Sequence, residues 1–240
     1  LAKKSPEGIM DLVLGPEISG LAIHECVGHP YEADRILGRE GAQAGESFVE
    51  PELLGIKVGS EVFTVIDDPT LPGSFGFYLY DDEGITARPR YLIYKGLINE
   101  FLHNRETAYK FGIESNGAAR ASRFDREPIV RMANTYIAPG KMDFDELIQD
   151  IKYGIYIKTY GEWNINDLRY NMKFIGKEAW LIERGELKEM VREPVLEITT
   201  PRFYSSIDAV DKNLEFYSAH CGKGDPEQLI PVYCGGPNVR

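Results

Sequence analysis

The sequence His24-Glu25-Cys26-Val27-Gly28-His29 places two imidazoles and a carboxylate within six residues. The familiar zinc motif carries its two histidines at i and i+4 on one helix face, with a glutamate that serves as general base. Here the second histidine stands one residue later, at i+5. The residue types predict a metal site with its own base. The alternative interpretation is a helix end that carries two unrelated polar residues.

The spacing of the two histidines sets a condition on the backbone. At 3.6 residues per turn, side chains at i and i+4 lie about 40° apart around a helix, whereas side chains at i and i+5 lie about 140° apart. One metal can bind both rings only if the helix widens into a π-type turn, or ends, between His24 and His29. Such turns are frequent at functional sites. Gly28 should lower the cost of the distortion.

Composition excludes several classes of partner. The 240 residues include 27 Lys and Arg against 38 Asp and Glu, a net charge of −11. This excess of negative charge argues against binding to nucleic acid or to a membrane surface. No apolar stretch approaches the ~18 residues that a bilayer-spanning helix needs, and we expect no signal peptide from the opening residues.

The cysteine count favours a reducing compartment. Cys26, Cys221 and Cys234 are three, an odd number that argues against a disulfide framework. A cytoplasmic location is the simplest expectation.

The segment before the motif predicts a rigid support for it. Residues 9–14 read as a short strand, and Pro16 suits the first turn of a helix because its missing N–H is not needed there. Ile18, Leu21 and Ala22 mark a buried face at helical spacing, which leads directly into the first histidine.

The rest of the chain predicts many short strands and a few helices. Strands are expected at 62–66, 75–80, 90–94, 97–102, 129–137 and 153–160, with a second hairpin over 179–190. Two-residue turns are expected at Lys95-Gly96 and Arg184-Gly185. Helices are expected at 105–111 and 143–151, the latter capped by Asp143, and residues 38–45 read as a mobile loop. The prediction is therefore an α+β fold, mostly antiparallel, with the metal-site helix near the N-terminus.

A third ligand is available near the C-terminus. Residues 218–224 (Ser-Ala-His-Cys-Gly-Lys-Gly) are predicted to form a tight loop that presents a side chain. A catalytic zinc usually takes three protein ligands and a water, so the Cys221 thiolate would complete the set of His24 and His29. His220 competes for this role. A buried free cysteine is the alternative without a metal.

Several motifs, in order along nearly the whole chain, resemble those of the TldD/PmbA metallopeptidases (modulators of gyrase). The segments that carry the resemblance are residues 24–29 with Glu32 and Asp34, then 81–84, 92–96, 116–120, 134–136, 221–223 and 236–240. The chain resembles the catalytic, C-terminal part of such a protein over residues 1–240. On this resemblance, we expect that the sequence lacks the N-terminal domain that the family usually carries.

The resemblance implies a zinc peptidase of the HExxxH type that hydrolyses small or unstructured peptides. His24, His29 and Cys221 would hold Zn²⁺, and Glu25 would be the general base for a metal-activated water. The family works as dimers, so a homodimer or a heterodimer with a related subunit is implied. We expect the peptide to bind as an added strand at a sheet edge. His103 and Arg105 are candidate substrate contacts, although a solvated loop is an equal alternative.

Three other functions remain open. In a structural metal module, a fourth ligand such as His220 would close the site. In a metal-binding scaffold, or in a partner subunit of a peptidase dimer, the chain would have no catalysis of its own. A nucleophilic cysteine enzyme that uses Cys221 with His220 is disfavoured, because adjacent residues seldom point at each other.

Overall fold

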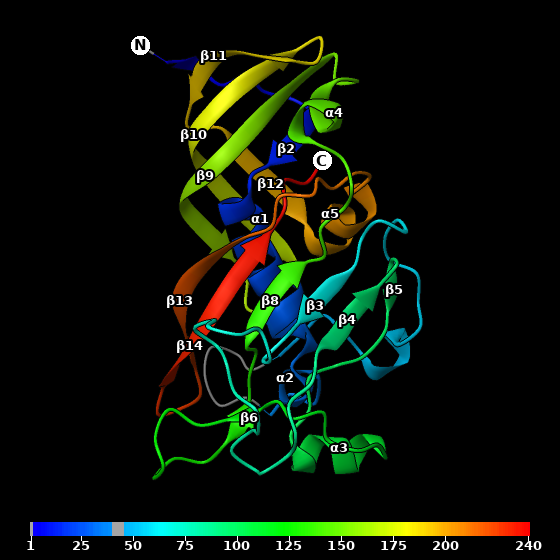
Figure 1. The fold of residues 1–240 in the computed structure, drawn as a ribbon, viewed down its shortest axis with the longest axis vertical. Helices are drawn as coiled ribbons and strands as arrows, with labels where there is room; N and C mark the ends of the chain where they lie inside the picture. The colour runs from blue at the N-terminus through cyan, green and yellow to red at the C-terminus, as the bar shows by residue number, and fades with distance from the viewer. Residues whose placement is uncertain (1, 40–45) are drawn as a thin grey trace.

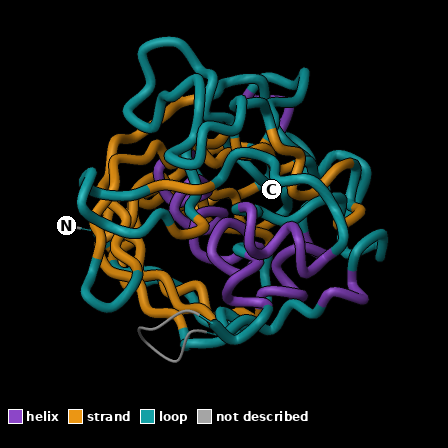
Figure 2. Tube along the Cα trace, turned by 90° about the horizontal axis from the view of Figure 1, so that it is seen from below, coloured by secondary structure: helices purple, strands orange, loops and turns teal. Residues whose placement is uncertain are grey.

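The fold is built around one buried helix that lies between two sheets. In the computed structural model, which describes residues 2–39 and 46–240, helix α1 (Pro16–Ile23) contacts β9 (Tyr153–Ile165) of one sheet and β14 (Gln228–Gly236) of the other. Figure 1 shows α1 between these strands, while Figure 2 shows the helices gathered mainly on one side of the strands. Every α1 residue except Glu17 is buried. The helix is therefore buried on nearly all sides, rather than on the single face that the sequence predicted.

The first sheet has the strand order β1-β11-β10-β9-β2, with β12 paired to β10. Its strands are β1 (Lys3–Lys4), β2 (Asp11–Leu14), β9, β10 (Asn171–Glu183), β11 (Glu186–Arg192) and β12 (Val195–Thr199). Strand β2 pairs with β9 in parallel and leads directly into α1. The long antiparallel pair β9–β10 thus fixes where α1 begins.

The second sheet has the order β13-β14-β8-β3-β4-β5. Its strands are β3 (Val65–Asp67), β4 (Arg90–Tyr94), β5 (Leu97–Ile98), β8 (Asn134–Ile137), β13 (Glu215–Lys223) and β14. A further small sheet joins β6 (Ala119–Arg120) to β7 (Ile129–Val130). Most pairings are antiparallel; β1–β11, β2–β9 and β8–β14 are parallel. The predicted α+β class with mostly antiparallel strands is confirmed.

Short helices join and cover these strands. They are α2 (Ala33–Ile36), α3 (Arg105–Phe111), α4 (Phe144–Ile148) and α5 (Thr200–Ser206), with 3₁₀ turns at His29–Tyr31 and Pro51–Leu53. The predicted bounds of α3 are confirmed, and Asp143 forms a capping box at the start of α4, which ends earlier than expected. No helix in the described part of the chain is long and apolar enough to cross a membrane.

Close approach of α1 to the second sheet depends on glycine. A Cβ on Gly20 would lie 2.7 Å from the backbone nitrogen of Gly235 in β14. Contacts below 3.0 Å to backbone cannot be relieved by a side-chain rotation, so the helix would have to move away from the strand. Gly20 therefore sets the depth at which α1 sits on the sheet.

Both predicted two-residue hairpin turns are present. Lys95 and Gly96 have φ of 49° and 77°, and Arg184 and Gly185 have φ of 52° and 76°. Positive φ at both central positions is the type I′ geometry, which matches the twist of the flanking strands.

Several predicted strand boundaries were wrong. Residues 75–80 form turns rather than a strand, since Ser74 N–H bonds Leu71 O and Phe77 N–H bonds Ser74 O. The single strand expected over 129–137 is two strands, because β7 pairs with β6 while β8 pairs with β3 and β14. The strand expected over 62–66 begins only at Val65, and the one over 97–102 ends at Ile98. Of the loop expected over 38–45, residues 40–45 lie outside the described residues.

Candidate metal centre

The two histidines of the motif flank a π-type turn. Residues His24–Gly28 form a π-helical turn at the end of α1, and the His29 N–H donates to the His24 carbonyl, an i→i+5 hydrogen bond. The extra residue in this turn brings the two imidazoles to the same side, with ring centroids 4.9 Å apart at an interplanar angle of 84°. The predicted widening of the helix is confirmed.

The π-type turn is accommodated by packing rather than by unusual backbone angles. Gly28 has φ −53° and ψ −64°, ordinary right-handed values. The expectation that its conformational freedom matters was therefore wrong. A Cβ at this position would lie 1.8 Å from the sulfur of Met132, so only glycine leaves room for the buried methionine. The Tyr204 hydroxyl of α5 donates to the Cys26 carbonyl within the turn.

The third candidate ligand comes from a strand, not from the loop that the sequence predicted. Cys221 lies in β13, paired opposite Ile230 of β14, and its Sγ is 3.3 Å from Nε2 of His29. Side chains alternate faces along a strand, so the adjacent His220 points the other way. Its exposed ring packs edge-on against Phe75 at a centroid distance of 5.0 Å. This alternation separates the two residues that were in competition for the metal.

The three donor side chains fit a zinc ion. Ligand atoms of His24, His29 and Cys221 all lie within 4.8 Å of one another, and all three residues are buried. Sulfur at ~2.3 Å and nitrogen at ~2.0 Å from one zinc, at a tetrahedral angle, would be about 3.5 Å apart. The 3.3 Å between Cys221 Sγ and His29 Nε2 is close to that value, and no separation among the three ligand atoms exceeds it by more than about 1.3 Å.

A buried carboxylate orients His29. Glu32 Oε2 accepts from His29 Nδ1 at 2.9 Å, and also lies 3.1 Å from Arg35 Nε and 3.2 Å from Lys223 Nζ. Burial alone would raise the pKa of Glu32, but Lys223, His29 and Arg35 together hold it well below its usual range. The carboxylate thus fixes the Nδ1–H tautomer and leaves Nε2 facing Cys221, the arrangement usual for metal-binding histidines.

The same surroundings favour the thiolate of Cys221. Burial would raise the pKa of this thiol, but His29 and His24 lower it well below its usual value. Lys223, two residues along β13, is held by both Asp34 oxygens at 2.7 and 2.8 Å. Thiolate is the form of cysteine that binds metals.

Glu25, the predicted base, lies next to an arginine that the sequence did not single out. Its side chain is 11% exposed, and Oε2 is 3.3 Å from Nη1 of Arg169 in the β9–β10 turn.

The two predicted substrate contacts, His103 and Arg105, lie elsewhere. His103 is 1% exposed, with Nδ1 3.2 Å from the Thr107 hydroxyl, and Arg105 is exposed in the first turn of α3.

Cys234 is a neighbour of the cluster that sequence reasoning missed. It is buried in β14 opposite Tyr217, and together with Cys221 it raises the pKa of His24 against the opposing effect of burial. It is not one of the three residues whose donor atoms come together. The only signal in the sequence was the cysteine itself.

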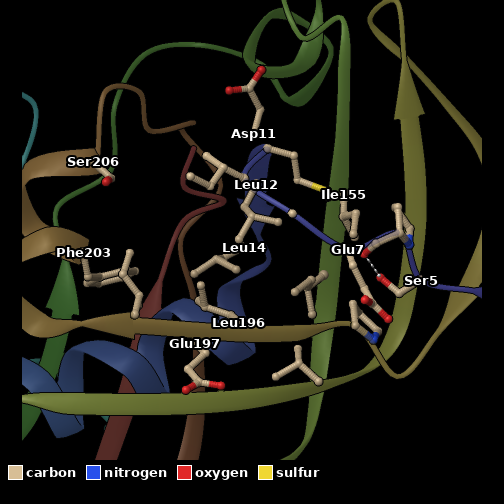
Figure 3. A pocket seen from close by; sticks show the side chains of 18 of the residues that line it. Ser5, Glu7, Asp11, Leu12, Leu14, Ile155, Leu196, Glu197, Phe203 and Ser206 are labelled. Carbon is tan, nitrogen blue, oxygen red and sulfur yellow. Dashed lines mark hydrogen bonds between the residues drawn. The ribbon is translucent and has the colours of Figure 1, made fainter.

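A large hollow elsewhere in the molecule contains none of these residues. It has a volume of about 1070 Å³ and is lined by the N-terminal segment, β9, β12 and α5. Figure 3 shows Leu12, Leu14 and Leu196 around it. The residues that carry chemistry therefore lie away from this hollow.

Comparisons with known proteins agree with the motif. The family model described as PmbA/TldA metallopeptidase C-terminal domain matches residues 7–240. A metalloprotease of Methanocaldococcus jannaschii is 40% identical over 239 residues, which is 100% of this chain and 51% of that protein. A zinc metalloprotease TldD homolog of Saccharolobus solfataricus is 30% identical over 237 residues, 97% of this chain and 50% of that protein.

The fold also matches a solved structure. The crystal structure of TldE from Thermococcus kodakarensis superposes with a TM-score of 0.77 at 22% identity, over 100% of this chain and 51% of that one. The chain spans about half the length of the curated relatives it matches. On the family match and the identity to these relatives, the chain belongs to the PmbA/TldD family of metallopeptidases.

Proposed function

We propose that this chain carries the catalytic site of a zinc-dependent peptidase of the HExxxH type. The observation that carries the proposal is the convergence of His24, His29 and Cys221, whose donor atoms lie within 4.8 Å of one another. A site with three protein ligands leaves a fourth position for water or substrate, as catalytic zinc sites do. The exposed ring of His220 lies on the far face of β13 and does not supply a fourth ligand.

Each residue has a separate task in the proposed reaction. When bound, zinc would polarise a peptide carbonyl and lower the pKa of a water toward ~7. Glu25 takes a proton from the attacking water and delivers it to the leaving nitrogen. Glu32 holds His29 in the tautomer that presents Nε2 to the metal. The buried position of all three ligands excludes bulk water from around the metal.

The substrate that suits this site is an extended, unstructured peptide. Among the described strands, β13 pairs only with β14, so the outer edge of β13 is open to a further strand. A peptide added there would bond through its main chain, without demanding a particular side-chain sequence. Because Cys221 belongs to β13, the added strand would run beside the metal.

We further propose that the enzyme works as a dimer with a second, related subunit. Relatives are named as TldD homologs, and the fold neighbour is TldE, which suggests a TldD/TldE-type pairing or a homodimer. A reducing, cytoplasmic compartment would keep the Cys221 thiol available for the metal, and the three cysteines are all free in this structure.

The test is the variant Glu25→Gln, with Glu17→Gln on the same helix as the matched control. Glu25→Gln should keep one zinc per chain and lower peptide hydrolysis by ~10²–10⁴-fold, because it removes proton transfer but no ligand. Glu17→Gln should change neither quantity. Near-parental turnover in Glu25→Gln would show that Glu25 is not the base. A zinc-loaded parent protein that hydrolyses no peptide would instead support a scaffold or a partner subunit without catalysis.

A further inference from the structure

Arg169 brings a positive charge beside the proposed base of the candidate site. Its side chain is 12% exposed, and Nη1 lies 3.3 Å from Glu25 Oε2 as an ion pair. Within the described residues, neither Arg169 Nε nor Glu25 Oε2 has a hydrogen-bond partner. A buried N–H donor that lacks an acceptor is costly to keep. The Nε–H of Arg169 is therefore available to a ligand that supplies an oxygen.

The backbone holds Arg169 in place at some cost. Its φ of 63° is left-handed, a conformation that is unfavourable for a non-glycine residue. The turn that carries it is fixed on two sides. The Arg169 N–H bonds the Asn166 carbonyl at 2.8 Å, and the Thr200 hydroxyl of α5 donates to the Arg169 carbonyl at 2.6 Å. A strained residue that is held this firmly beside a candidate base is typical of a functional position.

The position of Glu25 limits which ligand oxygen the guanidinium can meet. A general base must lie within hydrogen-bond reach of the water that attacks the scissile carbonyl. A donor 3.3 Å from the base carboxylate is therefore beside the carbonyl that reacts, rather than at a distant part of the peptide. A guanidinium suits that place because negative charge develops on the carbonyl oxygen during the attack.

We propose that Arg169 is a catalytic residue that binds the scissile carbonyl oxygen and stabilises the oxyanion; this rests on the proposed peptidase function. The water oxygen forms a bond to the carbonyl carbon, and its proton passes to Glu25. The carbonyl π electrons move onto oxygen, where the guanidinium donates hydrogen bonds. The C–N bond then breaks, and the proton from Glu25 goes to the leaving nitrogen.

The experiment compares Arg169→Met and Arg169→Gly in the intact, zinc-loaded protein. Two variants are used because glycine removes the strain at this backbone position and keeps the test valid if methionine disturbs the turn. Both should lower kcat by ~10²–10³-fold with KM nearly unchanged, since the contact strengthens only in the transition state. Arg88→Met, which removes another arginine–carboxylate pair, Arg88–Glu100, should leave both constants unchanged.

A binding measurement separates direct contact from an effect through Glu25. In a Glu25→Gln background, adding Arg169→Met should weaken a phosphinic peptide, a tetrahedral analogue, by ~10²-fold. The affinity for the substrate peptide of the same sequence should change little. If Arg169 acts only through Glu25, the analogue affinity will not fall further, and the proposal is overturned.

Two further outcomes bear on the same claim. Peptides with free and with amidated C-termini should be cleaved alike at internal bonds. A strict need for the free carboxylate would indicate that Arg169 binds the C-terminus of the substrate peptide, and would overturn the proposal. Full activity in both Arg169 variants, with Glu25→Gln inactive, would overturn this inference alone and leave the peptidase function standing.

Discussion

The substitution Gly28→Ala tests how the π-type turn is accommodated. The added Cβ would lie 1.8 Å from the Met132 sulfur, where atoms in contact need ~3.5–4.0 Å, so the methionine must move by roughly 2 Å. Met132 is 1% exposed and has little free space. Overpacking of this kind costs about 1–3 kcal/mol, against a gain of up to ~1 kcal/mol from the better helix propensity of alanine. We expect a net loss of about 1–2 kcal/mol.

The background Met132→Ala reverses the sign of this effect. Without the methionine sulfur, Gly28→Ala should be neutral or stabilising, because only the propensity gain and partial filling of the cavity remain. The assay is urea unfolding of four metal-free proteins: the parent, Gly28→Ala, Met132→Ala and the double variant. Zinc affinity is measured in parallel. Gly28→Ala alone should also weaken zinc binding, because the clash with Met132 strains the turn that carries the adjacent ligand His29. If Gly28→Ala lowers the free energy of unfolding equally in the parent and in the Met132→Ala background, the packing explanation is refuted.

Three further changes have defined outcomes. Gly20→Ala should destabilise the fold by more than Gly28→Ala in urea unfolding, because its Cβ would meet the backbone of β14 at 2.7 Å rather than a side chain. Burial lowers the pKa of His103 to about 4. As the pH drops, the unfolded chain therefore takes up a proton at His103 before the folded chain does, and the free energy of unfolding falls from pH ~6.5 toward ~4. The loss should be about 2 kcal/mol between pH 7.5 and 5, and His103→Gln should flatten that slope in urea unfolding. His220→Ala should leave zinc content unchanged, as measured by metal analysis of the purified variant, because its ring faces away from the cluster.

The local parts of the site could be predicted from the sequence. The i+5 spacing of His24 and His29 requires a wider turn by helix geometry alone, and the structure has that turn. Local turn chemistry likewise predicted the hairpin at Arg184-Gly185 and the cap at Asp143. These features depend on residues within a few positions of one another, which is why sequence patterns report them.

The remaining parts depend on pairing between distant segments. The glycines and small residues around Cys221 indicated a loop, but pairing with β14 makes the segment a strand. Strand periodicity then decides between Cys221 and His220, a choice that the sequence left open. Arg169 reaches Glu25 only because the β9–β10 turn folds back over the end of α1. No local sequence pattern predicts a contact between residues so far apart in the chain.

The central claim is a zinc ion held by His24, His29 and Cys221, and zinc-edge X-ray absorption tests it most directly. The parent protein should hold one zinc per chain, with one sulfur at ~2.3 Å and two nitrogens at ~2.0–2.1 Å. Cys221→Ser should lose the sulfur signal, whereas Cys234→Ser, at the buried cysteine of the next strand, should keep it. A parent spectrum with only nitrogen and oxygen ligands, or a sulfur signal that survives Cys221→Ser, would contradict the assignment.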